Sequence, residues 1–271
     1  MLMTQNARRT VIDFVKEKLD GSWDRLPAFD FKKLKDCPRF GSPGRYFDCD
    51  DTNIMRAIYV VLWQDMFPDL TLENLGSSRP YRGDTLNTFH TMFGREIPEK
   101  PGLYAGLEKY SPNDDLRNAV QDFQQNICST LGNFAVLPNC YGADTTLNLY
   151  RGTNHWRDFF DRFLIELGRH LTGESAHDTV LMQLLQANTC AFQSYRTAEG
   201  FKNFLRGLLL EDYCTVLNMQ PRTIFIMNYH WMNPDDRESY FKAAAHYLET
   251  ASAIIRNRGE RMKNLLKEQL A

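Results

Sequence analysis

The sequence predicts a mainly α protein, a compact multi-helix domain with a small β-hairpin and a long C-terminal helix. Three observations support this class. Over most of the chain apolar residues recur at intervals of three and four, the spacing that places them on one face of a helix. Only two short segments look extended. The final stretch, 235–270, keeps the helical spacing with no proline and a single glycine.

The length and composition predict one folded unit. The chain has 271 residues, of which 43% are hydrophobic, so it can bury a substantial core while staying near the upper size of one domain. We therefore expect a single mostly helical domain over 1–271, with a division into two lobes near residue 113. The formal net charge of -2 gives no global basic field that would attract nucleic acid.

The chain shows no sign of membrane insertion or of disulfide bonding. Its N-terminus lacks the apolar core of a signal peptide, and the longest apolar run, Ala57–Trp63, is too short to cross a bilayer. The six cysteines lie far apart, without a CxxC pair, which favours reduced thiols. We expect a soluble, cytoplasmic protein with no membrane partner.

The first half should contain two helices separated by an irregular stretch. Helical spacing predicts a surface helix over 5–19. The stretch 21–49 is rich in Gly, Pro, Asp and Phe, which favours turning and extended backbone. A helix should then start at one of the capping candidates in Asp50–Thr52 and end before Pro68. The region 77–113 should turn often.

The second half should be helical after one hairpin. A helix is expected from Asp114 to about Gly132. The extended-looking segments 133–139 and 145–152 are predicted to pair as the hairpin. Further helices should follow, and the last one has a candidate break at Gly259. The remaining segments are expected at 156–171, 176–192, 198–212 and 235–270, with 223–232 open between strand and buried helix.

The stretch "LNLYRGTNHWRDFF", 147–160, is polar between apolar runs and has two interpretations. A helix start explains Asn154 or Thr153 as a cap. It leaves Arg151 and Arg157 without a role, and arginines beside a helix N-terminus commonly bind anions. These arginines therefore either contact a ligand or pair with a carboxylate inside the protein.

A second polar stretch, "SSRPYRGDTLNTFHTMFG" at 77–94, has a similar composition. If Asp84 begins a short helix, Asn87 and His90 share one face of it. His90 would then be placed as a general base, although a histidine among apolar residues is more often part of the core. The aspartates of "DCDD", 48–51, are interpreted as helix caps.

The leading functional hypothesis joins the two stretches into one site for an anionic small molecule or nucleotide-like ligand, with or without catalysis. Arginine forks and amides suit phosphate or carboxylate groups, and one acid and one histidine are available for proton transfer. The catalytic candidates are His90 and Asp84. The ligand-binding candidates are Arg79, Arg82, Asn87, Asn133, Asn148, Arg151, Asn154 and Arg157.

Two other classes of function stay open. The first is a helical protein-interaction module, of the defence or toxin–antitoxin type, that binds a protein partner or a second copy without catalysis. The second is an enzyme acting on nucleic acid, for which the basic stretch 256–263 is the only support and is more simply a solvated helix face. The cysteine and histidine spacings predict no metal site, and no cofactor motif occurs.

Several segments together resemble an uncharacterised bacterial family known only as a domain of unknown function. The resemblance runs from about 29 to 262, and "TLGNFAVLPN" followed by "LNLYRG" and "DRF" is its most specific part. It implies no reaction, cofactor or catalytic residue. It implies a stand-alone bacterial cytoplasmic protein, of the kind encoded among accessory or mobile genes.

Overall fold

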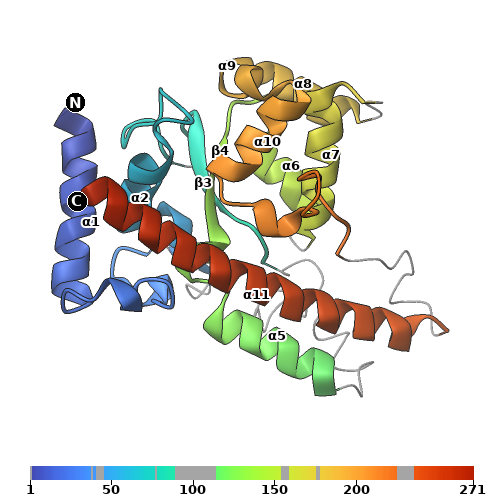
Figure 1. The fold of residues 1–271 in the computed structure, drawn as a ribbon, viewed down its shortest axis with the longest axis horizontal. Coiled ribbons are helices and arrows are strands. Elements are labelled where there is room, and N and C mark those ends of the chain that lie inside the picture. Colours follow the sequence, from blue (N-terminus) through green and yellow to red (C-terminus); the bar gives the residue numbers. More distant parts are fainter. Residues whose placement is uncertain are drawn as a thin grey trace.

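The computed structural model confirms the predicted fold class. Helices make up most of the described chain, strands are few and short, and a long helix, α11 (Arg237–Leu270), closes the sequence (Figure 1). The residues that the structure describes are 2–37, 39–40, 46–76, 78–88, 114–153, 159–174, 178–224 and 235–271.

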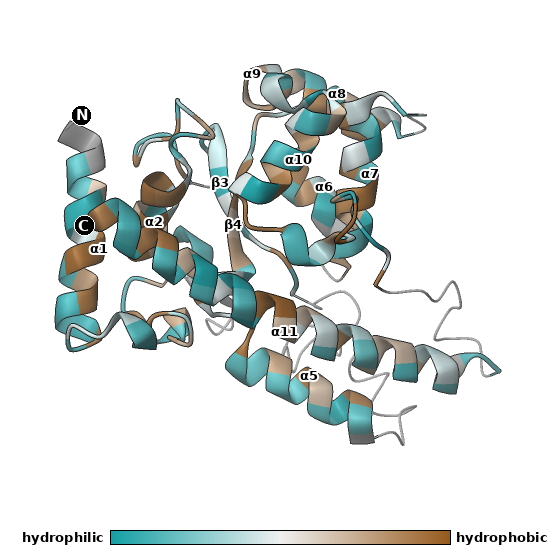
Figure 2. Cartoon of the chain, viewed as in Figure 1, coloured by the Kyte–Doolittle hydropathy of each residue, from teal (hydrophilic) through white to brown (hydrophobic). Residues whose placement is uncertain are grey.

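The N-terminal part pairs two helices, as expected. Helix α1 (Leu2–Lys18) packs on α2 (Asn53–Trp63), which Figure 2 shows as mostly hydrophobic. Thr52 begins α2, because its side chain accepts a hydrogen bond from the Met55 amide at 3.4 Å. The irregular stretch between them holds only short elements. These are the 3₁₀ helices η1 (Trp23–Arg25), η2 (Phe31–Lys33) and η3 (Cys49–Asp51) and the antiparallel strands β1 (Arg39–Phe40) and β2 (Tyr46–Phe47).

The principal strand pair joins segments far apart in the sequence. β3 (Tyr81–Thr85) runs antiparallel to β4 (Phe134–Pro138), with Gly83 opposite Val136. The prediction that segment 145–152 pairs with segment 133–139 as a hairpin is wrong, because 145–152 contains most of helix α6 (Leu147–Thr153). Thr146 explains the difference, since its side-chain oxygen accepts from the Leu149 amide and its carbonyl from the Tyr150 amide, which starts a helix.

The second part is a helical lobe that follows β4 and lies on the opposite side of the sheet from α1 (Figure 1). α7 ends at Gly173, whose φ of 79° suits glycine. The helical region predicted at about 176–192 forms two helices, α8 and α9, and the residues 175–177 lie outside the described part of the chain. The elements are α6, α7 (Phe160–Thr172), α8 (Thr179–Ala187), α9 (Thr189–Phe192), η5 (Gln193–Tyr195), α10 (Ala198–Gly207) and η6 (Glu211–Tyr213).

Helix α11 ties the two parts together. It packs against α5 (Asp114–Asn126) and η4 (Leu131–Asn133). The candidate break at Gly259 is wrong, because α11 is continuous there. Gly259 instead faces Gly132, where an added Cβ would lie 1.8 Å from the carbonyl oxygen of Ile255. Gly132 therefore allows a close backbone crossing and does not end α5, which stops at Asn126.

The largest hydrophobic core draws on residues from both sides of position 113, and a second cluster lies between α5 and the first half of α11. No helix in the described ranges is long and apolar enough to span a membrane. The ambiguous segment 223–232 lies, from 225 onward, outside the described residues.

Candidate functional site

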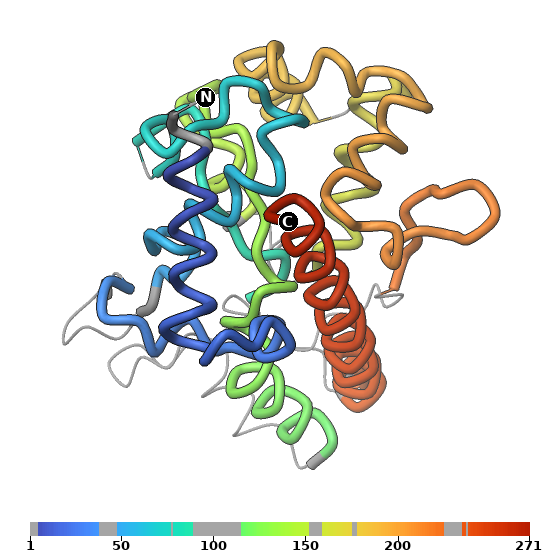
Figure 3. Tube along the Cα trace, turned by 60° about the vertical axis from the view of Figure 1, so that its left-hand side comes forward, coloured from blue at the N-terminus to red at the C-terminus, as the bar shows by residue number. Residues whose placement is uncertain are grey.

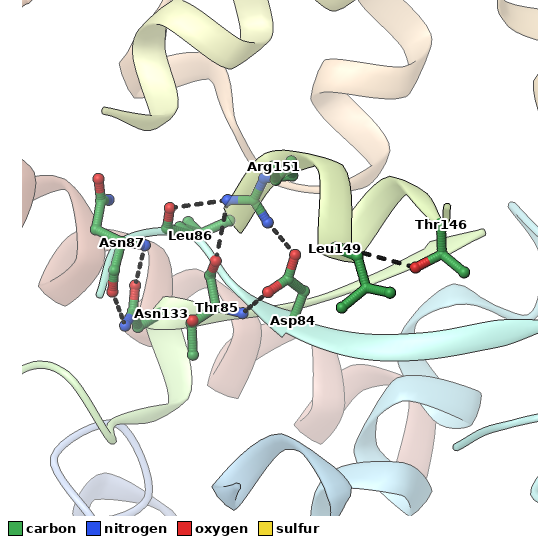
Figure 4. A network of polar contacts seen from close by, with 8 residues as sticks. All are labelled: Asp84, Thr85, Leu86, Asn87, Asn133, Thr146, Leu149 and Arg151. Carbon is green, nitrogen blue, oxygen red and sulfur yellow. Dashed lines mark hydrogen bonds and ion pairs between the residues drawn. The ribbon is translucent and has the colours of Figure 1, made fainter. Parts of the chain in front are cut away.

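Arg151 of α6 and Asp84 of β3 meet inside the protein (Figure 4). The Arg151 Nη1 donates to Asp84 Oδ2, and its Nη2 donates to the carbonyl oxygens of Thr85 and Leu86, each at 3.1 Å. The two side chains are only 1% and 3% exposed. The rings of Phe160 and Phe163 lie 5.1 and 4.9 Å from the guanidinium carbon. This arginine is therefore surrounded by protein.

Arg82, two residues before Asp84, contacts a second set of aspartates. Its Nη2 lies 3.3 Å from Asp48 Oδ2, and these two side chains are 24% and 17% exposed. Asp50 is buried behind them. Burial raises the pKa of Asp50 well above its ordinary value. A hydrogen bond to Asp48 and the negative charges of Asp48 and Asp84 raise this pKa further, whereas the positive charge of Arg82 lowers it. Asp50 therefore holds its proton more tightly than an ordinary aspartate does.

Tyr59 of α2 lies beside these aspartates. Its hydroxyl is buried and has no hydrogen-bond partner within the described part of the chain. Burial and the charges of Asp50, Asp84 and Asp48 raise its pKa. An added Cβ on Gly83 would lie 2.6 Å from the Asp50 carbonyl oxygen and 2.9 Å from the Tyr59 hydroxyl, so the strand passes here only because it carries no side chain.

Asn87 and Asn133 form the other end of the network. The Asn87 amide donates to Asn133 Oδ1 at 3.1 Å, and Asn133 Nδ2 donates to the Asn87 carbonyl at 2.9 Å. The Asn87 side chain donates to Tyr213 at 2.8 Å and accepts from the Tyr247 hydroxyl at 2.9 Å. All four residues are buried, so these bonds fix the segment after β3 to η4, η6 and α11.

The structure brings some of the predicted site residues together and leaves others apart. Asp84, Asn87, Asn133 and Arg151 belong to the network of Figure 4, and Arg82 joins it through the aspartates. Asn148 is buried on α6, and Arg79 is exposed in the turn before β3. The remaining candidates, His90, Asn154 and Arg157, lie outside the described residues.

The sequence interpretation missed the contribution of Asp48 and Asp50. The sequence pattern predicts that they cap a helix, whereas Thr52 caps α2. It also missed Arg258 of α11, which is buried and donates to the carbonyls of Leu208, Gly132 and Phe134 at 2.9, 2.6 and 2.7 Å. No local pattern distinguishes such residues, because their partners lie elsewhere in the chain.

A different kind of feature occurs on the surface, at the tip loop, which we define as Thr215–Gln220. Val216 and Leu217 within it are essentially fully exposed. The loop follows α10 and projects away from the body of the protein (Figure 3).

Among the described residues no group of three or more His, Cys, Asp or Glu side chains could hold a metal ion. In the comparisons with known proteins, no protein-family model, no curated protein and no solved structure matches this chain.

Proposed function

We propose that this protein is an interaction module that binds a protein partner through the tip loop. The observation that carries the proposal is that Val216 and Leu217, adjacent in the sequence, are essentially fully exposed in a loop that projects from the body of the protein (Figure 3). Single exposed apolar residues are ordinary, but adjacent ones held away from the body present an apolar contact surface. Burial of such side chains against a partner would stabilise a complex by about 1.5 to 3 kcal/mol each.

The loop is ordered by its own hydrogen bonds. The Thr215 amide donates to the Gln220 carbonyl at 2.8 Å, and the Met219 amide donates to the Thr215 carbonyl at 3.0 Å. The Asn218 side chain donates to Gln220 Oε1 at 3.1 Å. A loop that is already fixed loses little conformational entropy on binding. The apolar pair is therefore presented in a binding-ready form.

The base of the loop is anchored in the polar network. Tyr213, at the end of η6, is buried and bonded to Asn87, and its carbonyl accepts from the Arg222 amide at 2.9 Å. Glu211 pairs with Arg261 of α11 at 2.9 Å. The buried polar residues thus support a surface feature, which is a role they can perform without contacting a ligand.

Site-specific cross-linking tests the proposal. A photoreactive residue replaces Leu217 in one variant and the exposed Gln193 in another, and each is irradiated in an extract of the organism that encodes the protein. We expect a defined cross-linked partner from position 217 that the matched position 193 does not give. Unlabelled wild type should compete for it, and Val216→Asn/Leu217→Asn protein should not. Equal products from both positions would contradict the proposal.

A second candidate function, binding of a phosphate- or carboxylate-bearing small molecule, is favoured by the arrangement around Arg82. Among the described residues its guanidinium makes one ion pair, to Asp48, and both side chains are partly exposed. At the next residue of β3, the buried Tyr59 hydroxyl lies against Gly83 and has no hydrogen-bond partner among the described residues, so it is an available donor. Within this proposal Asp84 and Arg151 hold the site in place, and catalysis by Asp84 or His90 is a further prediction.

A thermal-shift screen tests this candidate. Phosphate, nucleotides and dicarboxylates are added to wild type and to Arg82→Gln protein. A ligand at about 100 times its dissociation constant should stabilise wild type by about 2.7 kcal/mol and the variant much less. Equal shifts in both proteins would remove Arg82 from the site.

The nucleic-acid alternative gains little from the structure. In the basic stretch 256–263, Arg256 pairs with Asp122, Arg258 is buried, and Arg261 and Lys263 pair with acidic residues. These side chains already interact within the protein. They do not form an unpaired basic surface of the kind that binds phosphate backbones.

A further inference from the structure

Cys37 and Cys49 hold their thiol groups in contact inside the protein. Their sulfur atoms lie 3.6 Å apart, and the two residues are only 5% and 4% exposed. Cys37 comes before β1, and Cys49 begins η3. Since 12 positions separate them in the sequence, the fold brings these two thiols together.

The pairing of β1 with β2 explains why the two thiols meet. Arg39 of β1 lies opposite Phe47 of β2, and two further residues outward along each segment lead to Cys37 and Cys49. Residues opposite each other in an antiparallel pair have Cβ atoms about 4.5 to 5.5 Å apart, close to the separation that a disulfide bond requires. The antiparallel pairing therefore places the cysteines where their sulfurs can bond.

Hydrogen bonds connect the backbone around both cysteines to the start of α2. The Asp36 side chain accepts from the Asn53 amide at 3.0 Å. The Cys49 carbonyl accepts from the Thr52 amide at 3.3 Å and from the Thr52 hydroxyl at 2.9 Å. Each cysteine thus lies on or beside a residue that is bonded to the first turn of the same helix, which holds the two thiols close together.

We propose that Cys37 and Cys49 are a site of oxidation, at which a hydroperoxide converts the two thiols into an intramolecular disulfide bond. The sulfur atoms need to approach only from 3.6 Å to about 2.05 Å, the length of the bond. The product would link the segment before β1 covalently to η3. This inference goes beyond the proposed interaction function and does not depend on it.

The reaction with hydrogen peroxide takes place in two steps. In the first step one thiolate sulfur attacks a peroxide oxygen, the O–O bond breaks, and a sulfenic acid and one water form. In the second step the other thiol attacks the sulfenic sulfur, the S–O bond breaks, and a second water leaves. The two sulfurs lose two electrons in total, the peroxide gains them, and the two thiol protons end in the two waters.

The environment of Cys49 determines how fast the pair reacts. Its pKa is raised, first by the hydrogen bond with Cys37, then by burial and by the charge of Cys37, whereas a hydrogen bond with Ser129 lowers it. Because the thiolate is the nucleophile, oxidation should be slow near neutral pH and faster as the pH rises. Once one sulfur is a sulfenic acid, the other thiol is already in contact with it. The disulfide should therefore form before further oxidation occurs.

Peptide mapping after oxidation tests this inference with the full chain. Cys190→Ser protein serves as the parent, because it lacks the exposed thiol that would link separate molecules. Trypsin places Cys37 in peptide 36–39 and Cys49 in peptide 46–56. After treatment with hydrogen peroxide and alkylation of the remaining thiols, we expect these two peptides to be joined. A reductant should separate them.

Variants of the parent show whether the link needs both thiols. Cys37→Ala and Cys49→Ala should each lose the joined peptides, whereas Cys214→Ala, which removes a different buried thiol, should form them as the parent does. In Cys37→Ala the sulfenic acid of Cys49 is no longer consumed by Cys37. This variant should therefore accumulate the sulfinic acid at Cys49 at least about tenfold more than the parent. Circular dichroism confirms that each variant is folded.

Thermal unfolding shows whether the bond fits the native structure. The oxidised parent should unfold at a midpoint about 5 °C or more above that of the reduced parent, because the bond restricts the unfolded chain and preserves a contact that the native state already makes. Oxidised Cys37→Ala should show no such increase. An unchanged or lower midpoint for the oxidised parent would mean that the bond forms only after this region opens, and would overturn the inference.

Cys128 is the competing partner, because its charge also contributes to the raised pKa of Cys49. It lies in a separate tryptic peptide, 118–151, so the two possible links are distinguishable. Joining of 46–56 to 118–151 in place of 36–39 would overturn the assignment of the pair. Recovery of both Cys37 and Cys49 as thiols after prolonged oxidation at alkaline pH would overturn the site of oxidation itself.

Discussion

The guanidinium of Arg151 and the carboxylate of Asp84 form an ion pair from which solvent is excluded, although the two residues lie 67 positions apart in the sequence. The pair connects β3, in the centre of the molecule, with α6 at the start of the helical lobe (Figure 1). Its position makes it a connection between two parts of the fold. The first prediction follows from this arrangement.

Replacing Arg151 by Met should destabilise the protein by about 3 to 5 kcal/mol, because Asp84 would keep a buried charge without its partner. Asp84→Leu should cost a similar amount, and the double variant should lose less than the sum of the two. Urea unfolding of the four proteins measures these differences. Arg9→Met is the control, since the Arg9–Asp13 pair is exposed and its loss should barely move the midpoint. Equal midpoints for Arg151→Met and Arg9→Met would contradict the prediction.

Arg258 should also be hard to replace, for a different reason. Its guanidinium donates to three backbone carbonyls, and a lysine cannot match that planar arrangement of donors. Arg258→Lys should therefore cost about 2 to 4 kcal/mol through buried carbonyls left without partners. Arg256→Lys, on an exposed face of the same helix, should leave the urea midpoint almost unchanged. A tolerated Arg258→Lys would show that the carbonyls find other partners.

The helices were predictable because their signals are local. The spacing of apolar residues in α2, α7, α10 and α11 depends only on neighbours within a few turns. The pairing of β3 with β4 was not predictable in this way, since nearly fifty residues separate the strands and no short-range pattern sets their register. The sequence therefore favoured the adjacent segment 145–152 as the partner, and Thr146 starts a helix there instead.

The candidate site was predictable in its composition and not in its contacts. Arg151 and Asp84 are candidates because each is a polar residue between apolar segments, where a buried charge needs a partner. The structure shows that each of these two residues is the charged partner of the other. The grouping of Asp50 with Tyr59 depends on how β3 crosses α2. The exposure of Val216 and Leu217 is likewise a property of the folded chain, because the sequence of a short loop does not show whether its apolar side chains are buried or exposed.

The thiols provide a test of burial. None of the six cysteines forms a disulfide bond, and Cys190 is the exposed one, whereas burial raises the pKa of Cys128 to about 11 and that of Cys214 to about 12. Because the thiolate is the reactive form, a thiol reagent near pH 8 should modify Cys190 first in the native protein and all six after denaturation. Cys190→Ser should remove the fast phase alone. Fast modification of several thiols in that variant would show that the native packing is looser than described.

Asp50 should make stability depend on pH in a direction opposite to that of most carboxylates. Its pKa in the folded protein is raised above the ordinary 3.8, first by burial and then by Asp48 and Asp84. The folded state therefore holds this proton more tightly than the unfolded chain. The associated stability is fully present below about pH 3.8 and is lost as the pH rises through the folded-state value, at up to about 1.4 kcal/mol per pH unit.

Asp50→Asn isolates this contribution, because asparagine has nearly the same shape and no proton to lose. The variant should match wild type in urea unfolding near pH 4 and become more stable than wild type as the pH increases toward 8. The matched control is Asp36→Asn, an exposed aspartate whose side chain accepts from the Asn53 amide at 3.0 Å. Its difference from wild type should not grow with pH in this direction. Parallel pH profiles for wild type and Asp50→Asn would mean that Asp50 is charged in the folded protein and that Arg82 outweighs the effect of burial.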